Sequence, residues 1–357
     1  MFGLTQRNKP VLGIDISSTA IKLIELSRTS SSSASHYRVE HYAIEPLVPN
    51  AVSEKKITDP DAVGQSIRKA LGKAKTKTKR AAVAVAGSSV ITKMVTMPGD
   101  LNDEEMEGQI QLEADQYIPF PLEEVNLDFD VVGPNPNAPD MVDVLIAASR
   151  QENVDDRVSA LELAGLTATV VDVEAYAMEN ACSLLLRSKS DDLVDKTIAI
   201  ADVGAATTTL YVLSKGQIIY TREQNFGGQQ LRDEVQRRYG LSREQASQRV
   251  LDGDVAENYE TEILLPFKEA LAQQIGRALQ FFYSGTTYNR VDRVLLAGGP
   301  ASIPKIDILI EDRLKVPTTI ANPFGQMSLS PSIKSQELMR EAPGMMVAVG
   351  LALRGFD

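Results

Sequence analysis

Residues 12–26 read LGIDISSTAIKLIEL, and residues 199–213 read AIADVGAATTTLYVL. When the second stretch is set under the first, Asp202 falls below Asp15. Each copy runs as an apolar strand to its aspartate, passes through a tight turn of small residues and returns as a second strand. A third strand and a helix follow in both places. This internal repeat predicts two lobes, each built on one β-β-β-α unit.

The two turns carry groups that bind phosphate. Backbone N–H groups of a tight turn, together with short hydroxyl side chains, donate hydrogen bonds to phosphate oxygens without steric bulk. The candidate residues are Ser17, Ser18, Thr19, Gly204, Ala205, Thr207 and Thr208. Asp15 and Asp202 would repel phosphate, so they need a cation between, and oxygen ligands beside a polyphosphate favour Mg²⁺ held through water. Either turn alone is more often an ordinary turn, whereas two matched copies favour a nucleotide.

Two glycine pairs add to this pattern. Residues 294–304, VLLAGGPASIP, form a buried strand that ends at Gly298 and Gly299 and leads almost at once into a helix. Glycine lets the backbone approach a flat ligand closely, here an adenine ring or a ribose. Gly227 and Gly228 open a further helix, whose N-terminal amides could face an anion. Neither a GxxxxGK(S/T) nor a GxGxxG motif occurs, so a P-loop or dinucleotide-binding fold is unsupported.

Composition limits the function classes. The chain has 357 residues with 37 basic and 48 acidic side chains, a net charge of −11, which argues against sequence-independent nucleic-acid binding. One cysteine, Cys182, and two histidines exclude an internal disulfide and a zinc cluster of His and Cys ligands. The first ten residues lack a signal-peptide core, and the longest apolar run, 344–353, is far shorter than the roughly 20 residues of a membrane span. We therefore expect a soluble, cytoplasmic protein that meets a membrane only through partners.

Strand and helix patterns divide the chain into units. The expected units are residues 1–86 and 169–195 for the first lobe, 87–168 for an inserted α+β subdomain, 196–340 for the second lobe with an insertion at about 229–284, and 341–357 for a C-terminal helix that returns to the first lobe. In the inserted subdomain we expect strands at 125–132 and 142–148, separated by the loop GPNPNAPD. A low-complexity hairpin tip is expected at 29–35, and Asp59 or Asp61 is expected to cap the first helix.

These motifs resemble those of the actin-like ATPases. GIDISSTAIK (13–22) is similar to their first phosphate loop, ADVGAATTTL (201–210) to the second and LLAGGPASIP (295–304) to the adenosine motif. VVDVEAYAMENA (170–181) and MMVAVGLALR (345–354) are similar to the two helices that connect the lobes. The resemblance implies an α/β fold, duplicated, two-lobed and ribonuclease H-like, with an inserted small α+β subdomain in the first lobe. The residues that it adds to the nucleotide site are Lys22 and Pro300.

Within this superfamily the sequence is most similar to the PilM family of type IV pilus assembly. Its most PilM-like stretch is LNDEEMEGQIQLEADQYIPFPLEEV, residues 101–125. The related division protein FtsA normally continues into a linker and an amphipathic membrane helix, whereas this sequence ends after the second connecting helix. The resemblance implies a scaffold that binds Mg-ATP, or ADP, between its lobes and holds the N-terminal tail of the membrane protein PilN. It also implies a place on the cytoplasmic face of the inner membrane and contacts with other pilus and motor components, and it leaves a homo-oligomer or ring open.

The peptide-contacting residues and the role of Glu174 each have a purely structural alternative. In PilM proteins the PilN tail lies between the inserted subdomain and the first lobe, and Tyr117, Ile118 and Phe120 would offer an aromatic wall to a peptide there. They would equally well pack the core of the insert itself. Glu174 best matches the position from which actin-like proteins orient the attacking water, but a carboxylate there repels the terminal phosphate, so at most slow ATP turnover is expected. The alternative for Glu174 is a first-turn carboxylate favoured by the helix dipole.

Two other functions stay open from the sequence. A small-molecule kinase of the same superfamily would need an acceptor pocket and a general base, and no such constellation stands out. An FtsA-like polymerising division protein would attach to membranes through an amphipathic helix, which this sequence does not show. Cys182 lies on the apolar face of the first connecting helix, and we expect it to be buried and structural.

Overall fold

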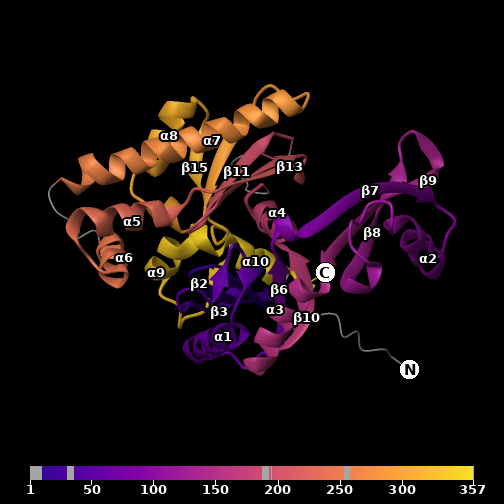
Figure 1. Ribbon diagram of the computed structural model, residues 1–357, viewed down its shortest axis with the longest axis horizontal. Coiled ribbons are helices and arrows are strands. Elements are labelled where there is room, and N and C mark those ends of the chain that lie inside the picture. The colour runs from indigo at the N-terminus through magenta and orange to yellow at the C-terminus, as the bar shows by residue number, and fades with distance from the viewer. Residues whose placement is uncertain (1–9, 30–35, 187–192, 194, 253–257, 357) are drawn as a thin grey trace.

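The computed structural model describes residues 10–29, 36–186, 193, 195–252 and 258–356. Within them the chain forms two lobes and a smaller subdomain that projects away from both (Figure 1). Most of the predicted hairpin tip, residues 30–35, lies outside the described residues.

The first lobe is built on a mixed sheet in the order β10-β6-β1-β2-β3-β16. Its strands are β1 (Leu12–Ile16), β2 (Ala20–Arg28), β3 (Tyr37–Pro46), β6 (Arg80–Val85), β10 (Thr167–Val173) and β16 (Ser328–Leu329). β1, β2 and β3 pair antiparallel, and β6 and β10 continue the sheet in parallel on the other side of β1. β16 comes from the second half of the chain and extends this sheet at β3.

The second lobe repeats this arrangement in the order β13-β12-β11-β14-β15. Its strands are β11 (Ile198–Val203), β12 (Thr208–Ser214), β13 (Gln217–Gln224), β14 (Arg293–Ala297) and β15 (Thr318–Ile320). β11, β12 and β13 pair antiparallel, and β14 and β15 follow in parallel. Asp15 lies opposite Lys22 in the first hairpin, and Asp202 lies opposite Thr209 in the second. The two sheets therefore confirm the duplicated α/β fold that the repeat predicts.

Helices cover both sheets. The first lobe carries the hairpin β4 (Val52–Ser53) and β5 (Lys56–Ile57) and the helices α1 (Pro60–Ala74) and α3 (Gln151–Leu163). The helices of the second half are α5 (Gly228–Tyr239), α6 (Arg243–Asp252), α7 (Leu265–Gly285), α8 (Ile306–Leu314) and α9 (Ser335–Glu341). Among the described residues, no helix has both the length and the apolar character that a bilayer crossing requires.

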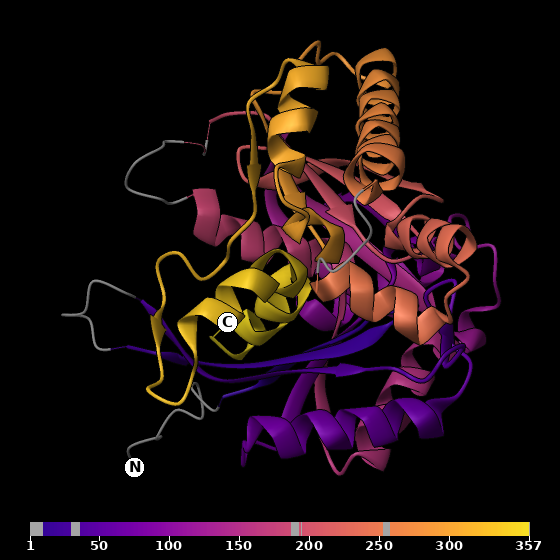
Figure 2. The ribbon, with the colours of Figure 1, turned by 90° about the vertical axis from the view of Figure 1, so that its left-hand side faces the viewer.

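The helix α1 shows how the sequence places these elements. Asp59 is its N-cap, and the Asp59 carboxylate accepts a hydrogen bond of 2.9 Å from the N–H of Ala62. Val63 and Ile67 recur at helical spacing and are fully buried against the first sheet. Figure 2 shows α1 beneath this sheet and the yellow C-terminal helices between the sheet and the second lobe.

The helices α4 (Glu174–Leu186) and α10 (Met346–Leu353) pack against each other in the centre of the molecule. A Cβ added at Gly350 would lie 1.7 Å from the carbonyl oxygen of Ala177 in α4. A Cβ added at Gly13 in β1 would lie 2.0 Å from the carbonyl oxygen of Ala348 in α10. The glycines thus let α10 contact α4 and β1 backbone to backbone. One apolar core includes these helices together with strands of both sheets, and so joins the two lobes.

The projecting subdomain has a sheet in the order β7-β9-β8, covered by α2. Its elements are β7 (Val90–Pro98), α2 (Asp103–Ala114), β8 (Val125–Asn135) and β9 (Ala138–Arg150). The prediction that GPNPNAPD separates two short strands is wrong, because β8 and β9 pair as far as Asn135 and Ala138. Pro134 is tolerated since β8 is an edge strand with register shifts at this end. α3 packs against α1 in the first lobe, where Ala160 and Leu161 are fully buried.

Cys182 lies on the buried face of α4 with no exposed surface, which confirms the expectation of a buried residue. Burial, with a smaller contribution from Glu179, raises the pKa of the thiol to about 12. We expect the native protein to react slowly with a thiol reagent between pH 7 and pH 10, because the thiol is both inaccessible and protonated. The urea-unfolded chain should react at once under the same conditions. Rapid labelling of the native protein would contradict this placement of α4.

Candidate nucleotide site between the lobes

The two predicted turns meet at a cluster of charges. In the first hairpin, Lys22 Nζ donates a hydrogen bond of 2.9 Å to Asp15 Oδ2. Burial alone would lower the pKa of Lys22, but the charges of Asp15, Asp202 and Glu174 raise it. Burial raises the pKa of Asp202, and the nearby charge of Asp15 raises it further, whereas the charges of Lys22 and Lys55 lower it. Aspartates from two lobes therefore lie within electrostatic range of each other and of the same lysine.

Each turn keeps backbone donors for a ligand. Among the described residues, no protein acceptor takes the N–H groups of Ser18, Thr19, Ala205 or Ala206. In the second turn the N–H of Gly204 closes the loop by a hydrogen bond of 2.8 Å to a carbonyl three residues on. Successive amides left without protein partners at a tight turn form an anion-binding concavity. The backbone of both turns thus has the donors that the sequence predicts.

Some predicted donors serve the protein instead. The Ser17 hydroxyl donates to the Ala20 carbonyl at 2.8 Å, and the buried Thr208 hydroxyl donates to the Phe226 carbonyl at 2.6 Å. These two hydroxyl protons are therefore not available to a phosphate, because each already holds its turn in shape. Thr207 and Thr19 carry no such hydrogen bond from their hydroxyls among the described residues.

The helix end at Gly227 and Gly228 also differs from expectation. The N–H of Gly228 donates to the Gly204 carbonyl at 2.9 Å, and the N–H of Gln229 donates to the Ala205 carbonyl at 2.7 Å. The prediction that these amides face an anion is wrong, because the second turn already occupies them. A Cβ at Gly227 would lie 2.5 Å from the Gly204 oxygen, so glycine is needed for this close contact. The start of α5 thus supports the turn from behind.

The glycine turn after β14 lies beside the same cluster. Gly298 has a φ of 85°, and a Cβ there would lie 2.1 Å from the carbonyl oxygen of Val203, one residue after Asp202. Its N–H donates to the Pro343 carbonyl at 2.7 Å. A Cβ at Gly344 would lie 3.8 Å from Gly299 N and 3.9 Å from Lys22 Cε. The fold therefore brings the third predicted motif to the two turns. Pro300 packs against Gly228 at the edge of this group.

Glu174 is the first residue of α4 and forms an ion pair with Lys55, a residue that the sequence did not indicate. Lys55 Nζ, in the β4–β5 turn, lies 3.2 Å from Glu174 Oε2 and 2.7 Å from Glu223 Oε2 in β13. Burial raises the pKa of Glu174, Lys55 opposes this rise, and Asp15 and Asp202 add to it. The neighbouring Asp172 points elsewhere and pairs with Arg354 at 2.7 Å. No local motif marks Lys55 or Glu223, because their partners are 119 and 168 residues away in sequence.

The charges of this cluster fit a hydrated divalent cation. Four carboxylates, those of Asp15, Glu174, Asp202 and Glu223, lie near three cations, Lys22, Lys55 and Arg157, so one negative charge is in excess when all are ionised. In the described part of the chain, no three His, Cys, Asp or Glu side chains are grouped as a metal site. Mg²⁺ does not need such a group, because it keeps several of its own waters and takes further oxygens from phosphate.

The predicted peptide wall is only partly available. Ile118 is 6% exposed and packs with Ala114, Val125 and Ala148, so it belongs to the core of the insert and cannot line a groove. Phe120 is half-buried, with the Arg150 guanidinium 4.0 Å from its ring centre, and Tyr117 has Lys93 Nζ 5.1 Å from its ring centre. A hollow of about 530 Å³ lies nearby between α2 and β8. Its lining residues are Glu107, Gln111, Leu122, Val125, Asn126, Leu127, Asp128 and Phe129.

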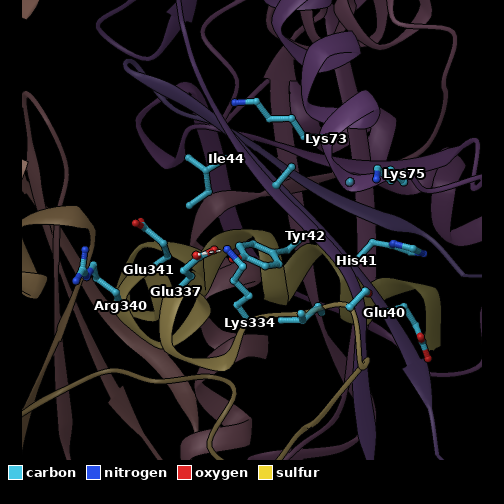
Figure 3. A pocket seen from close by; sticks show the side chains of 14 residues that line it. Glu40, His41, Tyr42, Ile44, Lys73, Lys75, Lys334, Glu337, Arg340 and Glu341 are labelled. Atoms are coloured by element: carbon cyan, nitrogen blue, oxygen red, sulfur yellow. Dashed lines mark hydrogen bonds and ion pairs between the residues drawn. The ribbon is translucent and has the colours of Figure 1, made fainter. Parts of the chain in front are cut away.

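A second hollow, of about 690 Å³, lies away from the predicted residues (Figure 3). Its walls come from β3, the end of α1 and the segment around α9, and they include Tyr42, Lys75 and Arg340. Lys73, in the last turn of α1, also lines it and pairs with Glu45 at 2.6 Å. Among the described residues that line it, none was predicted to bind nucleotide or peptide.

Comparisons with known proteins agree with this arrangement. The family described as "Type IV pilus assembly protein PilM" matches residues 13–356. A solved structure titled "PilM-PilN type IV pilus biogenesis complex" is 28% identical, with a TM-score of 0.79, and the match covers 98% of this chain and 99% of that chain. The ethanolamine utilization protein EutJ from Carboxydothermus hydrogenoformans shares the fold at 15% identity and a TM-score of 0.56, over 98% of this chain and 93% of that chain. The chain has the actin-like ATPase fold and belongs to the PilM family of type IV pilus assembly proteins.

Proposed function

We propose that this protein is a nucleotide-binding scaffold of the type IV pilus assembly platform. It binds Mg-ATP between its lobes and the N-terminal cytoplasmic tail of a PilN-type membrane protein at its inserted subdomain. Through that tail it is held at the cytoplasmic face of the inner membrane. Family membership supports the pilus role.

One observation carries the nucleotide proposal: two turns of the same design, from two lobes, converge on one acidic cluster. The amides of Ser18 and Thr19 on one side, and of Ala205 and Ala206 on the other, have no protein acceptor among the described residues. They would hold phosphate oxygens from opposite sides. Asp15 and Asp202 would order the water shell of Mg²⁺, and the turn at Gly298 would admit the adenosine. Thr207 and Lys22 would complete the phosphate contacts.

Calorimetric titration of the purified protein with ATP tests this site. In the presence of Mg²⁺ we expect one nucleotide per chain, and with EDTA in place of Mg²⁺ a markedly weaker affinity, since the two aspartates would then face phosphate without a cation between. GTP serves as the comparison for the base. No heat of binding with either nucleotide, together with unchanged thermal stability at millimolar Mg-ATP, would contradict the proposal.

Turnover is expected to be slow. Glu174 would be the group that orients a water, and its carboxylate is already engaged by Lys55 at 3.2 Å. A carboxylate held in an ion pair is a weak acceptor for a water proton and still repels the terminal phosphate. Nucleotide therefore acts mainly to hold the lobes in one relative arrangement, and hydrolysis resets that arrangement.

The peptide proposal rests on a relative at 28% identity whose structure is a PilM–PilN complex and matches this chain over nearly its whole length. In this chain, the half-buried ring of Phe120 and the hollow between α2 and β8 offer an apolar surface beside acidic side chains. β8 is an edge strand, so an extended peptide can also add to it through main-chain hydrogen bonds. These features suit a short extended tail with apolar and basic residues.

A change of Phe120 to Ser tests the peptide site. We expect affinity for a synthetic PilN tail peptide from the same organism to fall about tenfold, because removal of a half-buried aromatic anchor typically costs more than 1 kcal/mol of binding free energy. Mg-ATP affinity should not change. The matched control is Phe281→Ser in α7, another ring that stacks on an arginine, Arg222, at 3.7 Å. Equal peptide affinity in the two variants, measured by fluorescence anisotropy, would place the tail elsewhere.

A further inference from the structure

The β4–β5 turn presents one lysine to both lobes. Glu54 and Lys55, at its tip, have φ values of 48° and 63°, in the left-handed region that side-chain-bearing residues rarely adopt. Such a turn usually contains glycine or asparagine, so two charged residues there hold a strained backbone. Strain of this kind persists only where surrounding contacts hold it, and it collects at functional sites.

A buried arginine holds this turn from below. Arg157 in α3 is 3% exposed, and its guanidinium donates to three backbone carbonyls: Lys55 at 3.1 Å, Ala84 at 2.5 Å and Asn153 at 2.8 Å. It thereby joins the turn to β6 and to α3. Because its donors are directed at main-chain oxygens, the position of the Lys55 backbone is fixed relative to the first lobe.

The Lys55 side chain then reaches away from its own hairpin. Its ammonium pairs with Glu174 at the start of α4 and with Glu223 in β13, which belongs to the second sheet. The side chains of Lys55, Glu174 and Glu223 are 21%, 18% and 30% exposed, so these ion pairs are partly shielded from solvent. A partly buried pair of this kind contributes more than an exposed one, and loss of the lysine would leave two carboxylates facing each other.

We propose that Lys55 is a positioning residue that ties the first lobe to the second beside the proposed nucleotide site, through Glu223, and at the same time fixes the carboxylate of Glu174. With the tie in place the two turns stay at the separation that a polyphosphate needs. Without it the lobes separate, and bound nucleotide leaves faster. The effect on nucleotide release rests on the proposed function, whereas the tie between the lobes does not.

The distance between the lobes, measured in the absence of nucleotide, tests whether the Lys55–Glu223 ion pair ties them together. Spin labels at Lys69→Cys in α1 and Ile308→Cys in α8 report this distance, since both side chains are exposed and the native Cys182 is buried. We expect Lys55→Met and Glu223→Gln to lengthen and broaden the distance distribution. Lys55→Arg should give the same distribution as the unaltered protein. Glu174→Gln should leave the distance unchanged, because Lys55 and Glu174 both belong to the first lobe.

The matched control for this experiment is Lys56→Met, one residue further along the same hairpin. Lys56 pairs with Glu152 at 3.1 Å, and both side chains are about half exposed, so this ion pair contributes little. Identical distance distributions in Lys55→Met and Lys56→Met would overturn the proposal. A Lys55→Arg variant with the same long, broad distance distribution as Lys55→Met would also overturn it, because a tie made by charge needs only a cation at this position.

The second arm measures the release of a fluorescent ATP analogue. Lys55→Met and Glu223→Gln should each speed release several-fold, and the double variant should be no faster than Lys55→Met alone, since Glu223→Gln removes an ion pair that Lys55→Met has already removed. Additive effects in the double variant would overturn the shared tie. If the unaltered protein binds no analogue, the proposed nucleotide site has failed, and the distance experiment alone decides the role of Lys55.

Discussion

The Asp202→Ala variant is expected to lose about 100-fold in Mg-ATP affinity, which corresponds to about 2.7 kcal/mol of binding free energy. Asp202 would hold the metal through its waters, and removal of a group that orients metal ligands typically costs 10- to 100-fold in metal affinity. It is also one of the two carboxylates that the repeat places in matched positions. Calorimetry with Mg-ATP measures the loss directly.

The fold of this variant should stay intact. Burial raises the pKa of Asp202, so the ionised carboxylate is already costly in the folded state. Lys22 keeps its hydrogen bond to Asp15 when Asp202 is removed. Asp130→Ala, an exposed carboxylate of the inserted subdomain, is the control and should bind Mg-ATP as the unaltered protein does. Equal affinity in Asp202→Ala and Asp130→Ala would remove the aspartate from the site.

The Gly350→Ala variant is expected to lose about 3 kcal/mol in free energy of unfolding. A Cβ at this position would lie 1.7 Å from the Ala177 carbonyl oxygen, and backbone atoms cannot yield by a rotamer change. α10 must then move away from α4, which loosens the core that both lobes share. The midpoint of urea unfolding should fall accordingly, with no change in the slope that reports the exposed surface.

Gly72→Ala is the matched control for this prediction. Gly72 lies in α1, and a Cβ there meets nothing within 4 Å. The same substitution should raise stability by about 0.5–1 kcal/mol, since alanine favours the helix over glycine. A Gly350→Ala variant as stable as Gly72→Ala would show that the contact between α4 and α10 is not as close as described.

The repeat carried most of what the sequence could predict. Strand, aspartate and tight turn are local patterns, so the positions of Asp15 and Asp202 follow from alternation and spacing alone. Gly298 was predicted to let a ligand approach the backbone, whereas in the structure a Cβ there would meet the Val203 carbonyl oxygen, and the sequence did not single out Gly350. The predicted buried state of Cys182 follows from the apolar face of one helix.

The unpredicted features depend on long-range contacts or on competition within a turn. Lys55 meets Glu223 only because two lobes face each other, and nothing within its own hairpin indicates this. A threonine in a tight turn was predicted to donate its hydroxyl to phosphate. In the structure the Thr208 hydroxyl donates instead to a backbone carbonyl 18 residues away, which the local sequence does not indicate. The position of Ile118 was also undecided by the sequence, because an apolar residue after a helix can line a groove or pack in a core. The packing shows that it lies in the core of the insert.

The most direct measurement replaces Mg²⁺ with paramagnetic Mn²⁺, together with a non-hydrolysable ATP analogue, and follows the amide signals of the deuterated protein by NMR. The account predicts that the amides of Ser18 and Thr19 in one lobe and of Ala205 and Ala206 in the other broaden together at one equivalent of the complex. Mn²⁺ alone at the same concentration should leave them sharper. Broadening confined to one of the two turns, or absent from both, would contradict the claim that both lobes hold a single metal-bound polyphosphate.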